Sequence, residues 1–206
     1  NPNFNGTDIL GYKISDNAGN SDSTITYIKV NPVNDAPVIT KESITLSELG
    51  NSEILGSENI GQRVKDIISS FNIVTDVDIP FYIDISEVTG IAITSSTNLS
   101  ANKWKYCFNC TDSSVYSDSS SWNDIGTVSN SNALLLGPDD RIAFDSNGVS
   151  SDASASLKFN LWDMTDGSTV NTYVNITSTG GTTAISTSTI TVEQPVVQAC
   201  VLTIPN

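Results

Sequence analysis

The stretch Asn5–Pro37 reads NGTDILGYKISDNAGNSDSTITYIKVNPVNDAP and decides how the start of this chain folds. Two β-type runs, Ile9–Ser15 and Thr24–Val30, flank the segment Asp16–Ser21. The Asn, Gly and Asp residues of that segment readily adopt turn conformations. The pattern therefore predicts a β-hairpin at the start of the chain.

The hairpin is followed by a proline-bracketed connection. Pro32 and Pro37 enclose Asn34 and Asp35, and prolines outside a sheet mark a stiff, extended linker. We therefore expect four parts: residues 1–33 as the hairpin, 34–38 as the linker, 39–194 as a complete domain, and 195–206 as a further linker or the start of the next domain.

Beyond the linker, short β-type runs alternate with clusters of Gly, Asn, Asp and Ser, which is typical of an all-β sandwich. Val64, Ile67, Ile68 and Phe71 have the i, i+3, i+4, i+7 spacing of an amphipathic helix, so we expect one short helix over Gln62–Ser70. The expected strands of this domain are Ile44–Ser47, Ile73–Val74, Gly90–Thr94, Lys103–Tyr106, Ala133–Leu136, Arg141–Phe144, Ser156–Trp162 and Ser188–Val192. The segments between them are too poor in apolar residues to be expected in the core.

The charge balance and the absence of histidine narrow the function classes. The chain has 23 Asp and Glu against 9 Lys and Arg, a net charge of −14. Binding of nucleic acid or an anionic membrane by charge attraction is therefore disfavoured, and divalent cations are more natural partners. With no histidine, Ser-His-Asp and Cys-His nucleophile systems are excluded. We expect no enzyme activity.

Several motifs occur in the order seen in a class of bacterial adhesin repeats. They are GIAIT (Gly90–Thr94), WKY (Trp104–Tyr106), WNDIGTVS (Trp122–Ser129), ALLL (Ala133–Leu136), RIAF (Arg141–Phe144) and LKFNLWDMTDG (Leu157–Gly167). With the VNDAP linker, the chain resembles the cadherin-like, immunoglobulin-type tandem repeats of large secreted adhesins. It departs from the pattern at Cys107–Ser121, an expanded loop, and at Gln194–Val197, where a second linker motif is expected.

The resemblance implies the end of one repeat in residues 1–33, a complete repeat in 39–194, and calcium at the junction between them. Because a repeat that begins with its last strands is not whole, we expect a window cut from a longer extracellular chain. Calcium takes oxygen ligands from carboxylates, amides and backbone carbonyls. The candidate ligands are Asp8, Asp16, Asn34, Asp35, Glu48, Asp76 and Asp78. The competing interpretation is that Asn and Asp are simply good turn formers; for Asn34-Asp35 with Asp76-x-Asp78 we favour calcium.

A second acidic group comprises Asp139, Asp140, Asp163 and Asp166. It could form another ion site at the opposite pole of the domain, act as a glycosidase-type carboxylate pair, or consist of solvated turns. We favour turns, because these residues lie in repeat-type loops.

The Cys107-x-x-Cys110 spacing has three interpretations. A redox pair of this spacing normally opens a helix, whereas here it lies in a polar loop. A zinc site needs four ligands, and this chain has three cysteines and no histidine. A local disulfide in an oxidising compartment is the favoured interpretation. Cys200 is left to pair with a continuation of the chain or a neighbouring chain.

Asn-x-Ser/Thr triplets favour an extracellular or cell-surface setting. Their asparagines, the expected glycosylation sites, are Asn5, Asn98, Asn109 and Asn175. Trp104, Trp122 and Trp162 could form a sugar-stacking platform, but their place within strands favours burial in the core.

Two functions follow from these features. The first is a non-catalytic structural segment of a large extracellular adhesin or surface filament protein, rigidified by calcium. Its partners are neighbouring repeats and, in a filament, identical chains joined by strand addition, or surface glycans. The alternative is a carbohydrate-binding module that uses the loop from Trp104 to Trp122.

Overall fold

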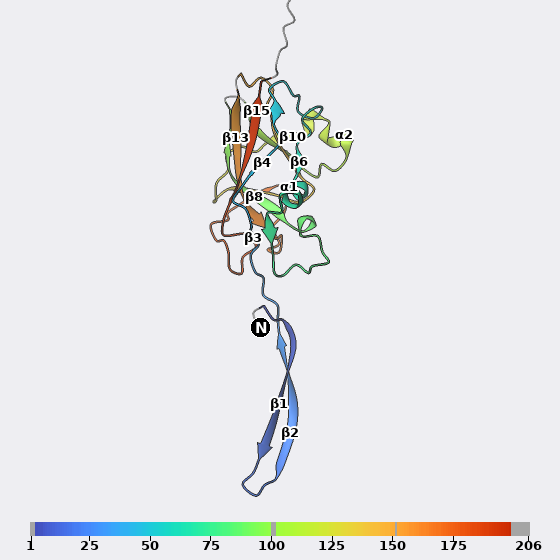
Figure 1. Ribbon diagram of the computed structural model, residues 1–206, viewed down its shortest axis with the longest axis vertical. Helices are drawn as coiled ribbons and strands as arrows, with labels where there is room; N and C mark the ends of the chain where they lie inside the picture. Colours follow the sequence, from blue (N-terminus) through green and yellow to red (C-terminus); the bar gives the residue numbers. More distant parts are fainter. Residues whose placement is uncertain (1–2, 100–101, 151, 199–206) are drawn as a thin grey trace, which may run out of the picture. The chain divides into compact units, whose positions relative to one another are not determined.

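A computed structural model of the chain describes residues 3–99, 102–150 and 152–198. It divides into two compact units, Asn1–Asn34 and Asp35–Asn206. Strands make up 42% of the structure and helices 9%, which confirms the all-β class. Figure 1 shows the labelled elements of both units.

The first unit is a single antiparallel hairpin of β1 (Gly6–Ser15) and β2 (Ser21–Val30). Asp16 shapes the turn, because its carboxylate accepts the backbone N–H groups of Ala18 and Asn20 at 2.9 and 2.8 Å. The predicted hairpin is confirmed, and both strands begin three residues earlier than expected.

Apolar side chains lie on both faces of the hairpin. The pairing of Asp8 with Ile28 and of Ile9 with Tyr27 assigns the faces, because residues opposite each other share a face. One face carries Leu10, Tyr12, Ile14 and Ile28, and the other carries Ile9, Ile25 and Tyr27; all seven are exposed within this unit. A two-stranded hairpin is marginally stable alone in water.

The second unit contains two main sheets. The larger sheet has the strand order β14-β11-β8-β13-β15-β4, with β5 also paired to β15. Its strands are β4 (Ser43–Thr45), β5 (Leu49–Gly50), β8 (Gly90–Thr97), β11 (Ala133–Leu136), β13 (Ala153–Trp162), β14 (Thr172–Val174) and β15 (Ile190–Val197). The smaller sheet has the order β10-β9-β12-β6, from β6 (Gln62–Arg63), β9 (Trp104–Cys107), β10 (Trp122–Asp124) and β12 (Arg141–Phe144). β3 (Val38–Ile39) and β7 (Val74–Thr75) form a separate antiparallel pair.

One buried cluster joins the facing sides of the two sheets. The larger sheet contributes Ile91, Ile93, Leu134, Leu136, Leu157, Phe159 and Leu161, and the smaller sheet contributes Trp104, Tyr106, Ile142 and Phe144. The helix α1 (Val64–Phe71) adds Val64, Ile67 and Ile68. The predicted helix is confirmed, but it begins two residues later than expected, because Gln62 and Arg63 pair with β12 as β6.

Loops cover the outer faces of both sheets. Ile176, Ala184 and Ile185, all outside the strands, pack with Leu135 and Trp162 on the outer side of the larger sheet. Leu55 and Cys110 pack with Cys107, Trp122 and Ala143 on the outer side of the smaller sheet. The expectation that the intervening segments stay out of the core was therefore wrong at these positions.

The ends of the second unit differ from the expected boundaries. Pro37 is buried and the N–H of Ala36 donates to Gly181 O at 2.8 Å, so part of the expected linker is attached to the domain. At the other end, β15 continues through Pro195 to Val197, three residues past the expected end at Gln194. Residues 199–206, including Cys200, lie outside the described residues.

Candidate functional site

Backbone hydrogen bonds link Asp35, Asp78 and Asp76 at the end of the second unit where the chain enters it. The N–H of Asp35 donates to Oδ2 of Asp78 at 2.6 Å, and the N–H of Asp78 donates to Oδ1 of Asp76 at 2.9 Å. Asp76 follows β7 directly, and β7 pairs with β3, the first strand after Asp35. The β3–β7 pair therefore brings the linker and the D-x-D turn side by side.

The environment of Asp76 is acidic. The side chain is half-buried, and its desolvation raises the pKa of the carboxyl. The negative charges of Asp78, Asp163 and Asp35 raise this pKa further, while the N–H of Asp78 opposes the shift. The carboxylate form is thus disfavoured, which is the electrostatic setting that a bound cation relieves.

Asp163 also acts on this acidic group, although the sequence placed it in the second acidic group. It follows β13 directly, and its N–H donates to Ala184 O at 3.0 Å, next to the loop that receives Ala36. Its Oδ1 accepts from the N–H and the hydroxyl of Thr165 at 2.9 and 2.7 Å. Only the sheet topology places the end of β13 near the end of β7, so no local signal could have revealed it.

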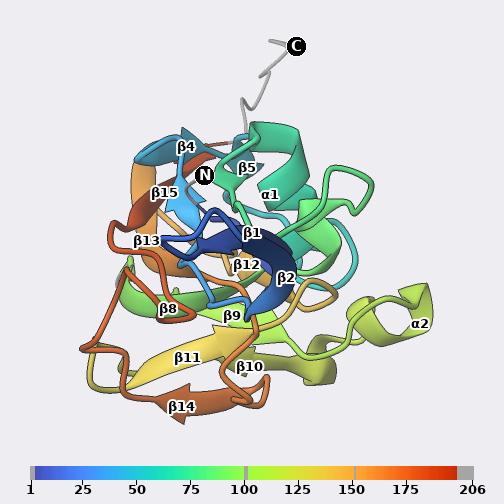
Figure 2. The same ribbon diagram turned by 90° about the horizontal axis from the view of Figure 1, so that it is seen from below.

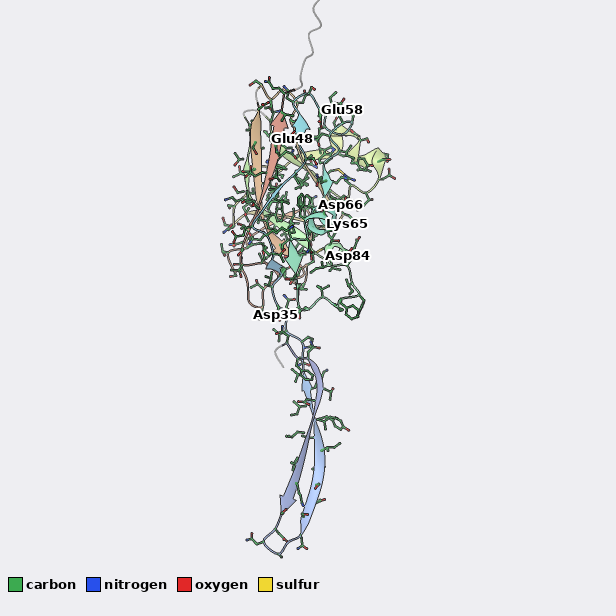
Figure 3. All side chains as sticks on the ribbon, viewed as in Figure 1. Asp35, Glu48, Glu58, Lys65, Asp66 and Asp84 are labelled. Carbon is green, nitrogen blue, oxygen red and sulfur yellow. A yellow bond between two sulfur atoms is a disulfide. The ribbon has the colours of Figure 1, made fainter. Side chains whose placement is uncertain are left out.

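The remaining predicted calcium ligands are Asp8, Asp16, Asn34 and Glu48. Asp8, Asp16 and Asn34 belong to the first unit. Asp16 is engaged in its own turn, where hydrogen bonds from Asn20 lower its pKa. Glu48 lies toward the far end of the second unit from Asp35, as Figure 3 shows, so the structure does not bring it to the acidic group.

The residues of the second acidic group make separate structural contacts. Asp140 is buried and accepts the N–H groups of Asn109 and Gly137 at 2.6 and 2.7 Å, and burial raises its pKa. Asp139 forms an ion pair with Lys65 at 2.9 Å, and Asp166 accepts the indole N–H of Trp162 at 3.1 Å. These contacts agree with the favoured interpretation as turns.

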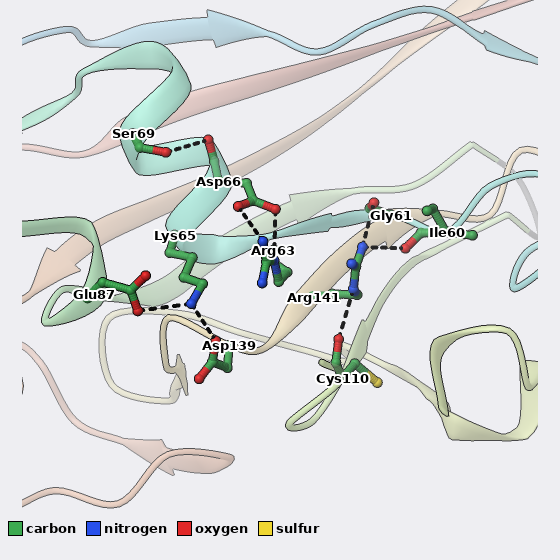
Figure 4. Close-up of polar contacts among 10 residues, drawn as sticks. All are labelled: Ile60, Gly61, Arg63, Lys65, Asp66, Ser69, Glu87, Cys110, Asp139 and Arg141. Atoms are coloured by element: carbon green, nitrogen blue, oxygen red, sulfur yellow. Dashed lines mark hydrogen bonds and ion pairs between the residues drawn. The ribbon is translucent and has the colours of Figure 1, made fainter. Parts of the chain in front are cut away.

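The cysteine loop is packed onto the smaller sheet around Arg141. The sulfurs of Cys107 and Cys110 lie at disulfide distance, with their Cα atoms 5.7 Å apart. Arg141 is buried, and its guanidinium donates to the carbonyls of Cys110 at 2.9 Å, Ile60 at 3.1 Å and Gly61 at 3.2 Å (Figure 4). Burial lowers the pKa of Arg141, while the charges of Tyr116 and Asp66 oppose that shift. Arg141 thereby ties the expanded loop to the segment before β6.

All three tryptophans are buried, as the placement within strands predicted. Trp104 is 1%, Trp122 5% and Trp162 0% exposed. The indole N–H of Trp122 donates to Tyr116 O at 3.0 Å. No tryptophan face is therefore open for stacking on a sugar.

The asparagines of the four glycosylation triplets, Asn5, Asn98, Asn109 and Asn175, are all exposed. The side chains of two of them also accept backbone hydrogen bonds. The side chain of Asn98 accepts the N–H of Trp104 at 3.2 Å, and that of Asn175 accepts the N–H of Thr177 at 2.9 Å.

A search of residues 3–99, 102–150 and 152–198 finds no group of three or more His, Cys, Asp or Glu positioned together to hold a metal ion. The same residues contain no helix with the length and apolar character needed to cross a membrane. Comparisons of the chain with protein-family models, curated proteins and solved structures found no match.

Proposed function

We propose that this chain is a non-catalytic structural segment of a large extracellular adhesin or surface filament protein. In this proposal the second unit is an immunoglobulin-like, cadherin-like repeat, and the hairpin is the last strand pair of the preceding repeat. Calcium binds where the chain enters the second unit. The partners are neighbouring repeats and, in a filament, identical chains.

The architecture of the second unit supports the repeat assignment. Two sheets share one buried cluster, and β4, near the start of the unit, runs parallel to β15 at its end. The motifs that resemble adhesin repeats supply the central strands of both sheets. β8, β11 and β13 lie in the larger sheet, and β9 and β12 lie in the smaller one.

The observation that carries the calcium proposal is the half-buried carboxylate of Asp76. The charges of Asp78, Asp163 and Asp35, which act on it, are all negative. Carboxylate oxygens are the hard ligands that calcium prefers. The remaining ligands of the ion would be backbone or amide oxygens and water.

Calcium here would act on the linker through Asp35. In the structure the N–H of this linker residue donates to the carboxylate of Asp78. An ion that bridges carboxylates of the linker and the D-x-D turn would restrict the direction in which the chain enters the domain. Binding to the folded state alone would also stabilise the second unit.

The proposal predicts that calcium raises the melting temperature of the intact chain and increases its radius of gyration, and that EGTA reverses both changes. Calorimetry and small-angle scattering, with magnesium as the control ion, measure these quantities. Identical melting and identical scattering in calcium and in EGTA would contradict the proposal.

A further inference from the structure

The segment between β7 and the short 3₁₀ helix η1 (Ile85–Glu87) exposes two neighbouring aromatic side chains, Phe81 and Tyr82, which we call the aromatic tip. Phe81 is 100% exposed, the largest exposed fraction of any large apolar side chain among the described residues, and Tyr82 is 75% exposed. Val77 and Ile83 of the same segment are also exposed. Figure 2 shows this segment in green, extending outward beside α1. The second unit therefore presents an apolar surface that its own core does not use.

Hydrogen bonds hold the backbone of the aromatic tip in one shape. The N–H of Ile83 donates to Pro80 O at 2.9 Å, so the two aromatic residues are the central residues of a β-turn. Directly after the turn, Oδ1 of Asp84 accepts the N–H of Ser86 at 3.0 Å and caps η1. A turn that is held at its base loses less conformational freedom on binding than a free loop.

The two rings of the aromatic tip form a wedge. Their centroids are 5.6 Å apart and their planes meet at 82°. Perpendicular rings do not offer one continuous flat face on which successive sugars of a glycan could stack. They do match a pocket that encloses both rings, and aromatic anchors buried in pockets are the residues that contribute most to protein interfaces.

The surroundings of the aromatic tip are acidic. Residues 74–90 contain no lysine or arginine, and their acidic residues are Asp76, Asp78, Asp84 and Glu87. Lys65, whose charge acts on Asp84, is itself paired at 2.9 Å with two carboxylates, those of Glu87 and Asp139. A partner that covers the tip therefore meets a negative rim, which lysine or arginine on that partner would complement.

The same charges disfavour two other occupants. A second copy of the chain has the same net charge of −14 and would add to the repulsion at the rim. A lipid surface with anionic headgroups would be repelled in the same way, and one with zwitterionic headgroups offers no net charge to pair with the rim. Charge complementarity therefore favours a basic protein.

We propose that the aromatic tip docks into an apolar pocket of another protein whose rim carries lysine or arginine. Phe81 and Tyr82 fill the pocket, and Asp78 and Asp84 pair with the basic rim. The partner is a different protein from the chain itself, so this surface goes beyond the proposed function and requires no bound ion.

Selection of a displayed library of short random peptides on the intact chain in EGTA tests the aromatic tip. The affinities of the selected peptides are then measured for the wild type and for the double variant Phe81→Ser/Tyr82→Ser. The expected peptides combine apolar residues with lysine or arginine, and they bind the double variant at least about tenfold more weakly. Because both side chains are exposed, the double variant should melt at the same temperature as the wild type.

The matched control for the aromatic tip is Phe108→Ser. Phe108 is another exposed aromatic residue, 44% exposed in the cysteine loop, so its loss should leave the peptide affinities unchanged. If the selected peptides bind the double variant as tightly as the wild type, or lose as much affinity in Phe108→Ser, the proposal is wrong.

Asp84→Asn tests the acidic rim separately. Asparagine keeps a side-chain acceptor for the N–H of Ser86 but removes the charge. Peptide affinity should fall about two- to fivefold at low salt, and this difference should disappear near 1 M salt, where the Debye length is about 3 Å. Tip-dependent peptides without basic residues, or an unchanged affinity of Asp84→Asn at low salt, would overturn the proposal.

Two further measurements detect the other occupants. Binding of phosphatidylcholine vesicles that is lost in the double variant would assign the aromatic tip to a lipid surface. Self-association in sedimentation experiments that is lost in the double variant would assign it to a second copy. Either result would overturn the proposal.

The aromatic tip and the ion site fail separately, because the peptide measurements are made in EGTA. Tip-dependent binding of basic peptides would support the docking surface even if calcium has no effect on melting. Calcium-dependent melting without tip-dependent peptides would support the ion site and reject the docking surface.

Discussion

The backbone N–H of Asp35 donates to the carboxylate of Asp78 at 2.6 Å across a sequence separation of 43 residues. This bond joins the entry of the second unit to the turn after β7, and Asp78 in turn donates its N–H to Asp76. The arrangement gathers negative charge at the linker, where the carboxyl of Asp76 has a raised pKa. The proposed ion site and the predictions of its pH dependence follow from this relationship.

Asp76 should make the calcium-free protein less stable as the pH rises. Its pKa is raised above the usual 3.8 in the folded state, so the folded chain holds this proton more tightly than the unfolded chain. The stability contributed by the proton is present at low pH and is lost as the pH rises through the folded pKa. Asp76→Asn should remove this loss.

The measurement is urea unfolding in EGTA from pH 4 to pH 7. As the pH rises, the free energy of unfolding of Asp76→Asn should increase relative to that of the wild type. Asp140, whose pKa is also raised by burial, is present in both proteins and cancels from the difference. A difference that is constant with pH would contradict the account.

Arg141 should contribute more to the free energy of unfolding than an exposed arginine of the same charge. Its guanidinium donates to three backbone carbonyls and lies 4.2 Å from the ring centroid of Tyr116. Lysine cannot reproduce this planar set of donors, so Arg141→Lys should lower the free energy of unfolding by about 2–4 kcal/mol.

The matched control for Arg141 is Arg63→Lys. Arg63 pairs at 2.8 Å with Asp66, whose side chain is 45% exposed, and such a pair contributes less than about 1 kcal/mol. Denaturant unfolding measures the loss of unfolding free energy in each variant, and the loss should be larger for Arg141→Lys. Equal losses would show that Arg141 does not anchor the cysteine loop.

Trp122 should behave as a core residue. Trp122→Ala removes a ring that is 5% exposed, so it should cost about 3–5 kcal/mol of folding free energy. Guanidinium unfolding followed by circular dichroism measures this loss. Retention of wild-type stability together with loss of glycan binding would favour the carbohydrate-binding alternative instead.

Two glycines with positive φ differ in how closely other atoms approach them, so their alanine variants separate the cost of close packing from that of backbone strain. A Cβ on Gly61, at φ +60°, would lie 2.5 Å from Ile142 O and 2.6 Å from the Trp122 ring. Gly148, at φ +87°, has nothing within 4 Å of that position. Gly61→Ala should therefore cost at least about 2 kcal/mol more than Gly148→Ala in thermal unfolding. Similar costs would mean that the contact with Trp122 relaxes freely.

The sequence predicted the elements with strong periodicity and missed those that depend on long-range packing. The strands Ala133–Leu136 and Arg141–Phe144 have the bounds that their apolar runs indicate, because turn residues flank each run. Ile176 and Ile185 could not be assigned to the core, since they lie in polar loops and are buried by packing on the distant residues Leu135 and Trp162.

The candidate site shows the same limit. The D-x-D turn and the linker could be identified from local motifs, and the β3–β7 pair brings them together. Glu48 was placed with them by analogy with the repeat family, whereas the structure has it toward the other end of the unit. Asp163 was missed because its proximity to Asp76 depends on where β13 ends in the sheet.

Calcium titration of the wild type, Asp78→Asn and Glu48→Gln tests the central claim most directly. Asparagine at position 78 keeps an acceptor for the N–H of Asp35 but removes the charge. At a calcium concentration about 100-fold above its dissociation constant, the wild type should gain about 2.7 kcal/mol in the free energy of unfolding. Glu48→Gln should keep this gain and Asp78→Asn should lose most of it. A wild type that gains nothing, or an Asp78→Asn variant that gains as much as the wild type, would contradict the account.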